Sequence, residues 1–386
     1  MRGSRFQKFI FWLILVFIVI AICEGAGYLA MKYNSRGMDF LSNRTYFRIR
    51  DMLMDNKNPE TFPKYLSQPY LAYIPFPGYT KNGEQQHNLS GYRGKAVPLT
   101  KDGNYRILCM GGSTTYGFKL DRFEEAYPAQ LDSLLNLYFA GDAAFKSKYK
   151  GIEVMNAGLE AGASAEELAQ YIFKYHYYKP DLVILQTGLN DALIDPQDTS
   201  YQPDYTHYRR MDFNLKPLPR QSAYLMHSYF FSYIIISLFY TDAANPFYYF
   251  EQDGTAKYAR WNTLNEDSLI KHGNYEYYAF PHNLKSLISQ IKMDSAQILL
   301  VPSVLNPFDK MVKENEGYRN RIALYNSMLR EIANNGTGVY VDFTADSIDY
   351  ARYGMDDCHL TAKGEQLKAR LISHKAIQLI KQELVQ

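Results

Sequence analysis

Three side chains from two distant parts of the sequence have the residue types needed for nucleophilic catalysis. Ser113 follows an apolar run and two glycines, a pattern in which a buried strand turns sharply and presents the serine hydroxyl outward. A serine becomes nucleophilic when a base takes its proton, and a carboxylate must orient that base. His359 can be the base, and Asp356, three residues earlier, can hold its other ring nitrogen. We therefore predict a catalytic triad of Ser113, His359 and Asp356.

Two alternative interpretations of these residues stay open. The Gly-Gly-Ser turn could be only a tight connection, or an N-cap for the helix that follows it. Asp357 could orient His359 instead of Asp356 if the loop is shifted by one residue. We interpret Cys358 as a bystander, because nothing basic apart from His359 is adjacent to activate its thiol.

Candidate donors for an oxyanion follow the same strand and two later ones. The carbonyl that a serine attacks develops negative charge, which preorganised hydrogen-bond donors stabilise. The Ser113 N–H, the Gly162 N–H and the side-chain amide of Asn190 could supply three such donors. Gly158 is a rival for the role of Gly162. Asn190 and Asp191 could instead cap a helix, but a Gly-x-Asn-Asp segment directly after a strand favours a site.

Alternating strands and helices would bring these residues together. The apolar runs are short and bounded by polar residues or glycine, which is typical of buried parallel strands. Strand, helix, strand at this spacing predicts right-handed crossovers and a three-layer α/β/α sandwich with a mainly five-stranded parallel sheet. The active site of such a sheet lies at the carboxyl ends of its strands. We expect strands at 105–110, 152–156, 182–187, 297–301 and 339–343, and helices near 125–139, 164–178, 276–292, 317–334 and 362–384.

The N-terminal segment predicts attachment to a membrane. Residues 1–8 are a basic n-region, and residues 9–31 form an apolar segment long enough to span a bilayer if Glu24 sits near an interface. Basic residues ahead of the apolar run predict that the N-terminus stays inside and the rest is exported. A cleaved signal peptide is the alternative. Either way, the catalytic region is expected outside the cytoplasm, in a periplasmic or extracellular location.

The remaining chain divides into a lead-in and a large domain. Prolines interrupt residues 32–104, which we interpret as a juxtamembrane lead-in, and residues 105–386 as the catalytic domain. An aromatic-rich insertion at about 197–275 contains the almost uncharged stretch 223–240. We expect this stretch to pack on the sandwich, and a second membrane-contacting element is the alternative.

Composition excludes some partners and leaves others open. The chain has 386 residues and a net charge of +2, which gives no support to a nucleic-acid partner. Its three cysteines show no zinc-ligand spacing, so we expect no structural metal. The sequence carries no indication of the oligomeric state.

Four motif blocks at successive strand ends resemble those of the SGNH (GDSL-like) hydrolase family. Their Ser, Gly, Asn and His, with Asp three residues before the His, match Ser113, Gly162, Asn190, His359 and Asp356. The resemblance covers roughly 105–195 and 297–385. Gly162 fits better than its rival because the Ala-Ser-Ala-Glu-Glu after it resembles the family's helix start. The serine block reads Gly-Gly-Ser-Thr where the namesake motif has Gly-Asp-Ser-Leu, a variant similar to the family's membrane-anchored branch.

The resemblance implies serine-dependent hydrolysis of an ester, often an acyl group on a lipid or an acetyl group on a sugar. It also implies a flavodoxin-like sandwich with no metal or organic cofactor. We therefore expect an exported, membrane-tethered esterase or deacetylase whose substrate is an acylated glycan or lipid. The alternatives are an O-acyltransferase acting on an envelope glycan, and a non-catalytic envelope scaffold or glycan-binding protein.

Overall fold

The computed structural model describes residues 5–34, 46–47, 50, 54, 64–68, 70–194, 205, 224–239 and 278–385. These residues belong to two compact units. The first comprises Met1–Gln68 and Arg210–Tyr258, and the second comprises Pro69–Arg209 and Ala259–Gln386. Most of the predicted insertion at 197–275 lies outside the described residues.

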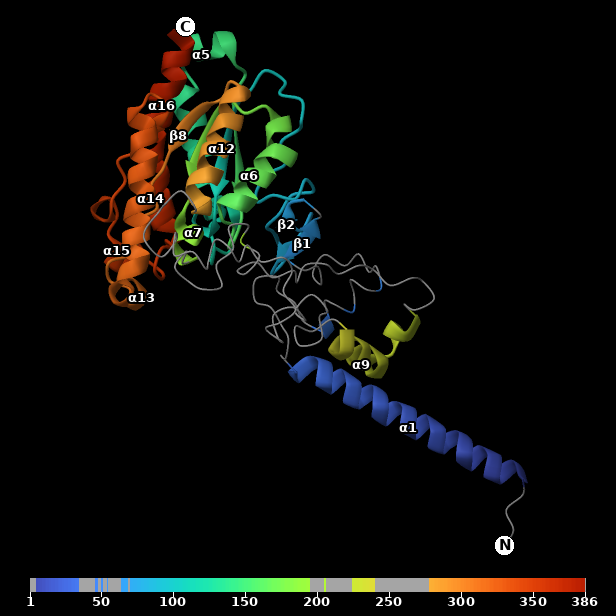
Figure 1. Cartoon of the computed structure of the whole chain (residues 1–386). Coiled ribbons are helices and arrows are strands. Elements are labelled where there is room, and N and C mark those ends of the chain that lie inside the picture. The colour runs from blue at the N-terminus through green and yellow to red at the C-terminus, as the bar shows by residue number, and fades with distance from the viewer. Residues whose placement is uncertain are drawn as a thin grey trace. The chain divides into compact units, whose positions relative to one another are not determined.

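The second unit is built around a five-stranded parallel sheet, as the sequence predicted (Figure 1). The first strand along the chain has the second strand on one side and the third on the other, which is the order of flavodoxin-like doubly wound sheets. The strands, in their spatial order, are β6 (Ile152–Gly158), β5 (Tyr105–Gly111), β7 (Leu182–Gln186), β8 (Gln297–Leu300) and β9 (Val339–Tyr340).

Helices cover both faces of this sheet and complete the predicted three-layer sandwich (Figure 1). Alternate side chains of a strand point to opposite faces, and β5 follows this rule. Leu108 and Met110 pack with α6 (Ser164–Phe173), α12 (Ala279–Met293) and α14 (Glu316–Asn334). Ile107 and Cys109 pack with α4 (Tyr127–Phe139), α5 (Ala143–Lys148) and α16 (Ala362–Val385).

Short helices and 3₁₀ turns lie between the main strands and helices of this unit. Two of them, α3 (Ser113–Tyr116) and α7 (Leu189–Leu193), directly follow β5 and β7. The others are the helices α13 (Lys310–Glu314) and α15 (Tyr350–Tyr353) and the 3₁₀ turns η1 (Phe123–Glu125), η2 (Tyr175–Tyr178) and η6 (Ala345–Ser347).

Residues 70–104, which the sequence assigned to the lead-in, form part of the second unit. They contain β2 (Ala72–Pro75), β3 (Thr80–Lys81) and β4 (Glu84–Gln85). Tyr73 is buried, and its hydroxyl donates to the Glu160 carbonyl at 2.5 Å. The compact unit therefore begins well before the first strand of the parallel sheet.

The first unit contains the predicted membrane segment. Helix α1 (Arg5–Tyr33) is long and apolar enough to cross a membrane, a property that N-terminal signal sequences share. The unit also contains β1 (Tyr65–Gln68), η3 (Tyr224–His227) and α9 (Tyr229–Phe239). Helix α9 packs against α1 (Figure 1), whereas the sequence analysis favoured packing on the sandwich.

Candidate active site

Ser113 is the first residue of α3, two residues after β5 ends at Gly111. The first N–H groups of a helix have no partner within the helix, so the Ser113 N–H has none in α3. Ser113 is 9% exposed and lies at the carboxyl end of β5, the strand between β6 and β7 in the sheet. This is the position at which doubly wound sheets bind ligands.

Gly158, at the end of β6, allows α3 to lie against the sheet. A Cβ at this position would come within 2.1 Å of the Tyr116 backbone nitrogen, which no side chain permits. The Gly158 N–H donates to the Asn156 side chain at 3.0 Å, and Asn156 in turn donates to the Tyr116 carbonyl at 3.2 Å. Gly158 therefore supports the helix that carries Ser113 and has its own N–H occupied.

The predicted triad residues lie in one hydrogen-bonded chain. His359 Nε2 is 2.7 Å from Ser113 Oγ, and His359 Nδ1 is 2.8 Å from Asp356 Oδ1. With Asp356 accepting from the protonated Nδ1, the lone pair of Nε2 faces the serine hydroxyl. The phenyl ring of Phe118 lies against the imidazole, with 4.9 Å between ring centroids.

The Asp356 carboxylate is held by more than the histidine ring. Its Oδ1 also accepts the backbone N–H groups of His359 and Cys358, and its Oδ2 accepts from Lys119 Nζ at 2.6 Å. Burial alone would raise the pKa of Asp356, but the hydrogen bond and charge of the His359 ring and the hydrogen bond from Lys119 outweigh it. The pKa of this carboxyl therefore lies well below its ordinary value, and the group is ionised at neutral pH.

Asp357, the alternative orienting residue, has different partners. Its carboxylate oxygens accept from the Tyr318 hydroxyl at 3.4 Å and the Cys358 thiol at 3.5 Å. Burial and the charge of Asp356 raise the pKa of Asp357. Burial also raises the pKa of the Cys358 thiol well above its ordinary value, which fits a bystander.

Gly162 and Asn190 lie beside Ser113, where the sequence placed the oxyanion hole. All three line one small cavity together with Gly112, and Asn190 Nδ2 donates to the Gly162 carbonyl at 2.7 Å. An amide nitrogen has two hydrogens, and this bond uses one. The Gly162 N–H donates to the Leu159 carbonyl at 2.9 Å, so in this geometry it is engaged in a turn.

Asp191, the residue after Asn190, links the elements around the site through hydrogen bonds. Its buried carboxylate accepts from the Ser164 backbone N–H at 3.1 Å and the Ser164 hydroxyl at 2.5 Å, and from the Tyr205 hydroxyl at 2.6 Å. Ser164 is the first residue of α6, where a negative charge is favoured by the helix dipole. Asp191 thus joins α7 to α6, while its neighbour Asn190 faces the cavity.

Several supporting residues had no recognisable motif in the sequence. Lys368 of α16 is buried, and its ammonium donates to the Thr114 carbonyl at 2.9 Å. His87 lies 2.8 Å from the Tyr116 hydroxyl, and the Arg93 guanidinium stacks on the Tyr116 ring at 4.4 Å. These side chains hold α3 from outside the motif blocks, and only the three-dimensional structure connects them with Ser113.

Asn306 holds the loop that carries the aspartate. Its side-chain amide donates to the Asp356 carbonyl at 2.8 Å, and its backbone N–H donates to the Asp357 carbonyl at 2.7 Å. Asn306 follows β8 in the chain and is 8% exposed. A polar residue shortly after a strand of the predicted sheet was the only signal that could have pointed to it.

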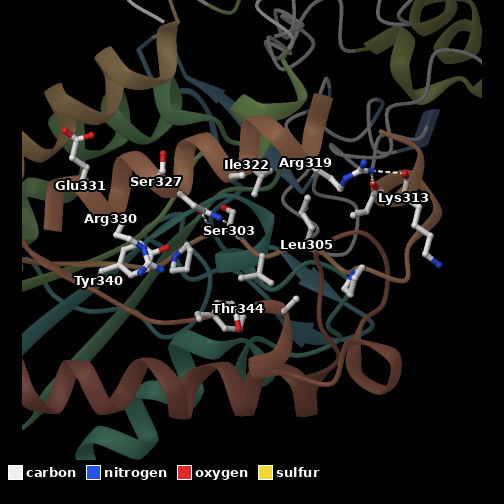
Figure 2. A pocket seen from close by; sticks show the side chains of 18 of the residues that line it. Ser303, Leu305, Lys313, Arg319, Ile322, Ser327, Arg330, Glu331, Tyr340 and Thr344 are labelled. Atoms are coloured by element: carbon white, nitrogen blue, oxygen red, sulfur yellow. Dashed lines mark hydrogen bonds between the residues drawn. The ribbon is translucent and has the colours of Figure 1, made fainter. Parts of the chain in front are cut away.

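A cavity of about 850 Å³ lies elsewhere in this unit, between α14 and the segments that follow β8 and β9 (Figure 2). Its lining includes Leu305, Ile322, Arg330 and Tyr340, and none of the triad residues. The Arg330 guanidinium stacks on the Tyr340 ring at 4.7 Å. The position of this hollow therefore does not coincide with the candidate catalytic residues.

The four residues Asp356, Asp357, Cys358 and His359 could offer ligand atoms within 4.8 Å of one another. Two of these residues already bind each other, and Asp356 also binds Lys119. A metal at this position would have to displace Ser113 from His359 or Lys119 from Asp356. The donor set therefore fits an acid–base site better than a metal centre.

Comparison with known proteins connects this geometry with a family. Residues 109–367 match the sequence model of the GDSL-like lipase/acylhydrolase family. An acetylxylan esterase of Xylanibacter ruminicola is 29% identical over 119 residues, which make up 29% of this chain and 22% of the relative. The chain thus spans about a fifth of the length of this curated relative.

Solved structures similar to this chain include three from bacteria. One is a putative lipolytic protein of the G-D-S-L family from Desulfitobacterium hafniense, with a TM-score of 0.39, 14% identity and coverage of 70% of this chain and 99% of that one. An acetylxylan esterase from Geobacillus stearothermophilus has a TM-score of 0.40 and 16% identity, with coverages of 71% and 95%. A GDSL-like lipase from Bacteroides thetaiotaomicron has a TM-score of 0.39 and 14% identity, with coverages of 74% and 93%.

Proposed function

Because the chain belongs to the GDSL-like lipase/acylhydrolase family, we propose that it hydrolyses esters and that Ser113, His359 and Asp356 are its catalytic residues. The observation that carries this proposal is the 2.7 Å separation of Ser113 Oγ and His359 Nε2, with Asp356 on the other ring nitrogen. A serine, a base within hydrogen-bond reach and an orienting carboxylate are the three parts of an activated nucleophile.

The reaction proceeds in two steps. Ser113 Oγ attacks the ester carbonyl while His359 Nε2 takes its proton, and Asp356 stabilises the imidazolium that forms. The imidazolium then gives this proton to the alkoxide oxygen of the alcohol as the ester bond breaks. The alcohol departs, and the acyl group remains on Ser113. A water molecule, deprotonated by the same histidine, attacks this ester and releases the acid.

The Ser113 N–H and the second hydrogen of the Asn190 amide are the proposed oxyanion donors. Asn190 is held against the Gly162 carbonyl, so its amide is oriented before the substrate arrives. Gly162 is the third proposed donor. Its N–H would have to leave the Leu159 carbonyl when the negative charge develops, since the two are 2.9 Å apart.

The substrate that fits best is an acetyl ester on a sugar. The cavity beside Ser113 is small and has no long apolar extension among the described residues that line it, which suits a short acyl group. The curated relative from Xylanibacter ruminicola is an acetylxylan esterase, and it supports a carbohydrate rather than a lipid as the alcohol.

The proposed location of the reaction is outside the cytoplasm. Helix α1 is apolar enough to anchor the chain, and the basic residues ahead of it favour an N-terminus that remains inside. The second unit follows α1 in the chain and would then be exported. An enzyme anchored in this way can reach acetylated glycans at the cell envelope.

The decisive experiment is the variant Ser113→Ala assayed with p-nitrophenyl acetate and with acetylated xylo-oligosaccharides. We expect hydrolysis to fall by about 10⁴-fold or more and fluorophosphonate labelling to disappear. Ser133→Ala, at an exposed serine on α4, is the matched control and should behave as wild type. Wild-type turnover in a correctly folded Ser113→Ala protein would refute the assignment.

A further inference from the structure

Helix α1 consists of two parts with different surroundings. Its apolar side chains up to Ile22 are exposed, with Ile14 at 51% and Phe17 at 63%. One side of its last part packs within the first unit, where Gly27 and Met31 are buried. An apolar span of about 20 residues crosses a bilayer, so the 29 residues of α1 leave roughly two turns beyond it.

Glu24, the acidic residue within α1, is bound by the start of α9. Its carboxylate accepts the backbone N–H of Tyr229 at 2.7 Å and the hydroxyl of Ser228. The first N–H groups of a helix have no partner within the helix and favour a negative charge. Helix α9 therefore supplies hydrogen-bond donors to a carboxylate that apolar residues precede in α1. In return, Glu24 caps the N-terminus of α9.

Gly27 sets how closely the two helices approach. A Cβ at this position would lie 2.5 Å from both the Cα and the backbone nitrogen of Phe230, and backbone atoms cannot move aside as a flexible side chain can. Gly25, two residues earlier, would meet nothing within 4 Å. The close approach of α1 and α9 thus requires glycine at position 27 and does not require it at position 25.

A small core extends this contact to the end of α1. Met31, Tyr46, Met226 and Ile236 are buried together. The Asn34 amide donates to the Tyr233 hydroxyl at 2.9 Å. If α1 were removed as a signal sequence, α9 would lose its cap and this core would lose one wall. The packing is therefore that of a retained helix.

The outer side of α9 is apolar and contains no charged residue. Phe231 is 46% and Leu238 is 57% exposed, and each belongs to a helix of sequence YFFSYIIISLF. Eleven residues rise only about 16 Å, too little to span a bilayer, so such a helix lies at its surface. The exposed side chains of α9 are apolar, like those of the helix α1 to which it is bound, and a lipid surface is the partner that suits both.

We propose that α1 is retained in the mature protein and that α9, joined to it by Glu24 and Gly27, lies on the lipid surface as a second membrane contact. The proposal rests on the proposed anchoring of α1 and is independent of the proposed catalytic residues. Tyr28 and Tyr224 are exposed tyrosines of this unit and suit the headgroup region, where aromatic side chains with a polar tip are enriched.

The test uses the full chain reconstituted in vesicles of phosphatidylethanolamine and phosphatidylglycerol. An environment-sensitive fluorophore is placed on Leu238→Cys in a Cys23→Ser background, and quenching by spin-labelled lipid is measured. The same label on Leu137→Cys, an exposed leucine of α4, gives the reference value. We expect quenching at 238 to exceed the reference at least twofold. Equal quenching at the two positions would overturn the lipid assignment and favour a protein partner.

The matched pair Gly27→Leu and Gly25→Leu tests the joint between the helices. Gly27→Leu should reduce quenching at 238 to near the reference value, whereas Gly25→Leu should leave it unchanged. Identical behaviour of the two variants would contradict the proposed contact. Both should hydrolyse p-nitrophenyl acetate as wild type does, which shows that the second unit is folded and keeps the esterase proposal a separate question.

The intact mass of the protein purified from membranes tests retention directly. A mass that includes residues 5–33 supports the proposal, and a chain that begins after Glu24 overturns it.

Discussion

The second unit contains two contrasting regions. The region around Ser113 has hydrogen-bonded candidate catalytic groups and a small cavity, whereas the region against α14 has a large cavity with no such group among the described residues that line it. The described residues beside Ser113 line a small cavity, and His359 there lies 2.7 Å from the serine oxygen and 2.8 Å from the Asp356 carboxylate. The hollow against α14 measures about 850 Å³, and its charged Arg330 is engaged with Tyr340. Arranged proton donors and acceptors, rather than volume, identify the candidate site.

A single segment after β8 connects the two regions. Residues 302–305 and Pro307 line the large cavity, while Asn306 between them binds the loop of Asp356. The regions can therefore be separated experimentally by changing residues that belong to one, to the other, or to the connection between them.

The largest effect is expected for Asp356→Asn. The amide would favour the wrong tautomer of His359 and could not stabilise an imidazolium, so kcat should fall by about 10⁴-fold. Steady-state hydrolysis of p-nitrophenyl acetate measures this change. Asp357→Asn is the matched control, since that side chain faces Tyr318, and a similar loss in both variants would show that the roles of the two aspartates are misassigned.

Asn190→Ala should produce the next largest effect. Removing one oxyanion donor commonly lowers kcat by about 10²- to 10³-fold while the substrate still binds. The separation of kcat from KM in the same assay tests this expectation. A variant that changed only KM would assign Asn190 to substrate binding instead.

Asn306→Ala should have an intermediate effect. Loss of the side-chain bond to the Asp356 carbonyl would loosen the loop, and kcat should fall by less than the roughly 10²-fold that a misplacement of about 1 Å can cost. Because the alanine keeps the backbone N–H to Asp357, the fold should survive. An unchanged kcat would mean that the loop is held in place without Asn306.

Asp356 should also contribute a pH-dependent part of the stability. Its pKa is depressed in the folded protein, so its contribution is fully present above its ordinary pKa of about 4 and is lost as the pH falls through the folded value. Wild type should therefore melt roughly 2–4 °C above Asp356→Asn at pH 7, and the difference should shrink below pH 4. Calorimetry across this range measures the effect, and a difference that grew in acid would contradict it.

The smallest effect is expected for Ala323→Trp in the large cavity. The substitution places a bulky side chain in the hollow without touching the triad, so kcat/KM for p-nitrophenyl acetate should stay within about twofold of wild type. A much larger loss would mean that the hollow takes part in catalysis and would break the contrast drawn above.

Much of the architecture was predictable because apolar runs and their spacing are local properties. The five strands and their parallel orientation follow from short buried segments separated by helical ones, and the structure confirms them. Ser113 and His359 were recognisable because each lies in a motif beside a strand end or a helix start. The prediction that they act together as a triad awaits the kinetic tests.

Other features depend on contacts between residues distant in sequence. Nothing near Lys119 or Lys368 in the chain indicates that one binds Asp356 and the other the Thr114 carbonyl. The stretch around α9 is equally apolar whether it packs on a sheet, on a helix or on lipid, so composition alone did not indicate its contact with α1. The hydrophobic pattern of a sequence identifies which segments are buried, but it does not identify the elements that they pack against.

The separation of Ser113 and His359 along the chain has a consequence for biogenesis. Their hydrogen bond joins residues 246 positions apart, and Lys368 reaches Thr114 across 254 positions. Contacts of such long range form late and slowly, because four further strands must be added before the last helix docks. If Ser113 and His359 act as proposed, a chain still emerging from the ribosome has no activated serine, and esterase activity should first appear when synthesis of the C-terminal helix is complete.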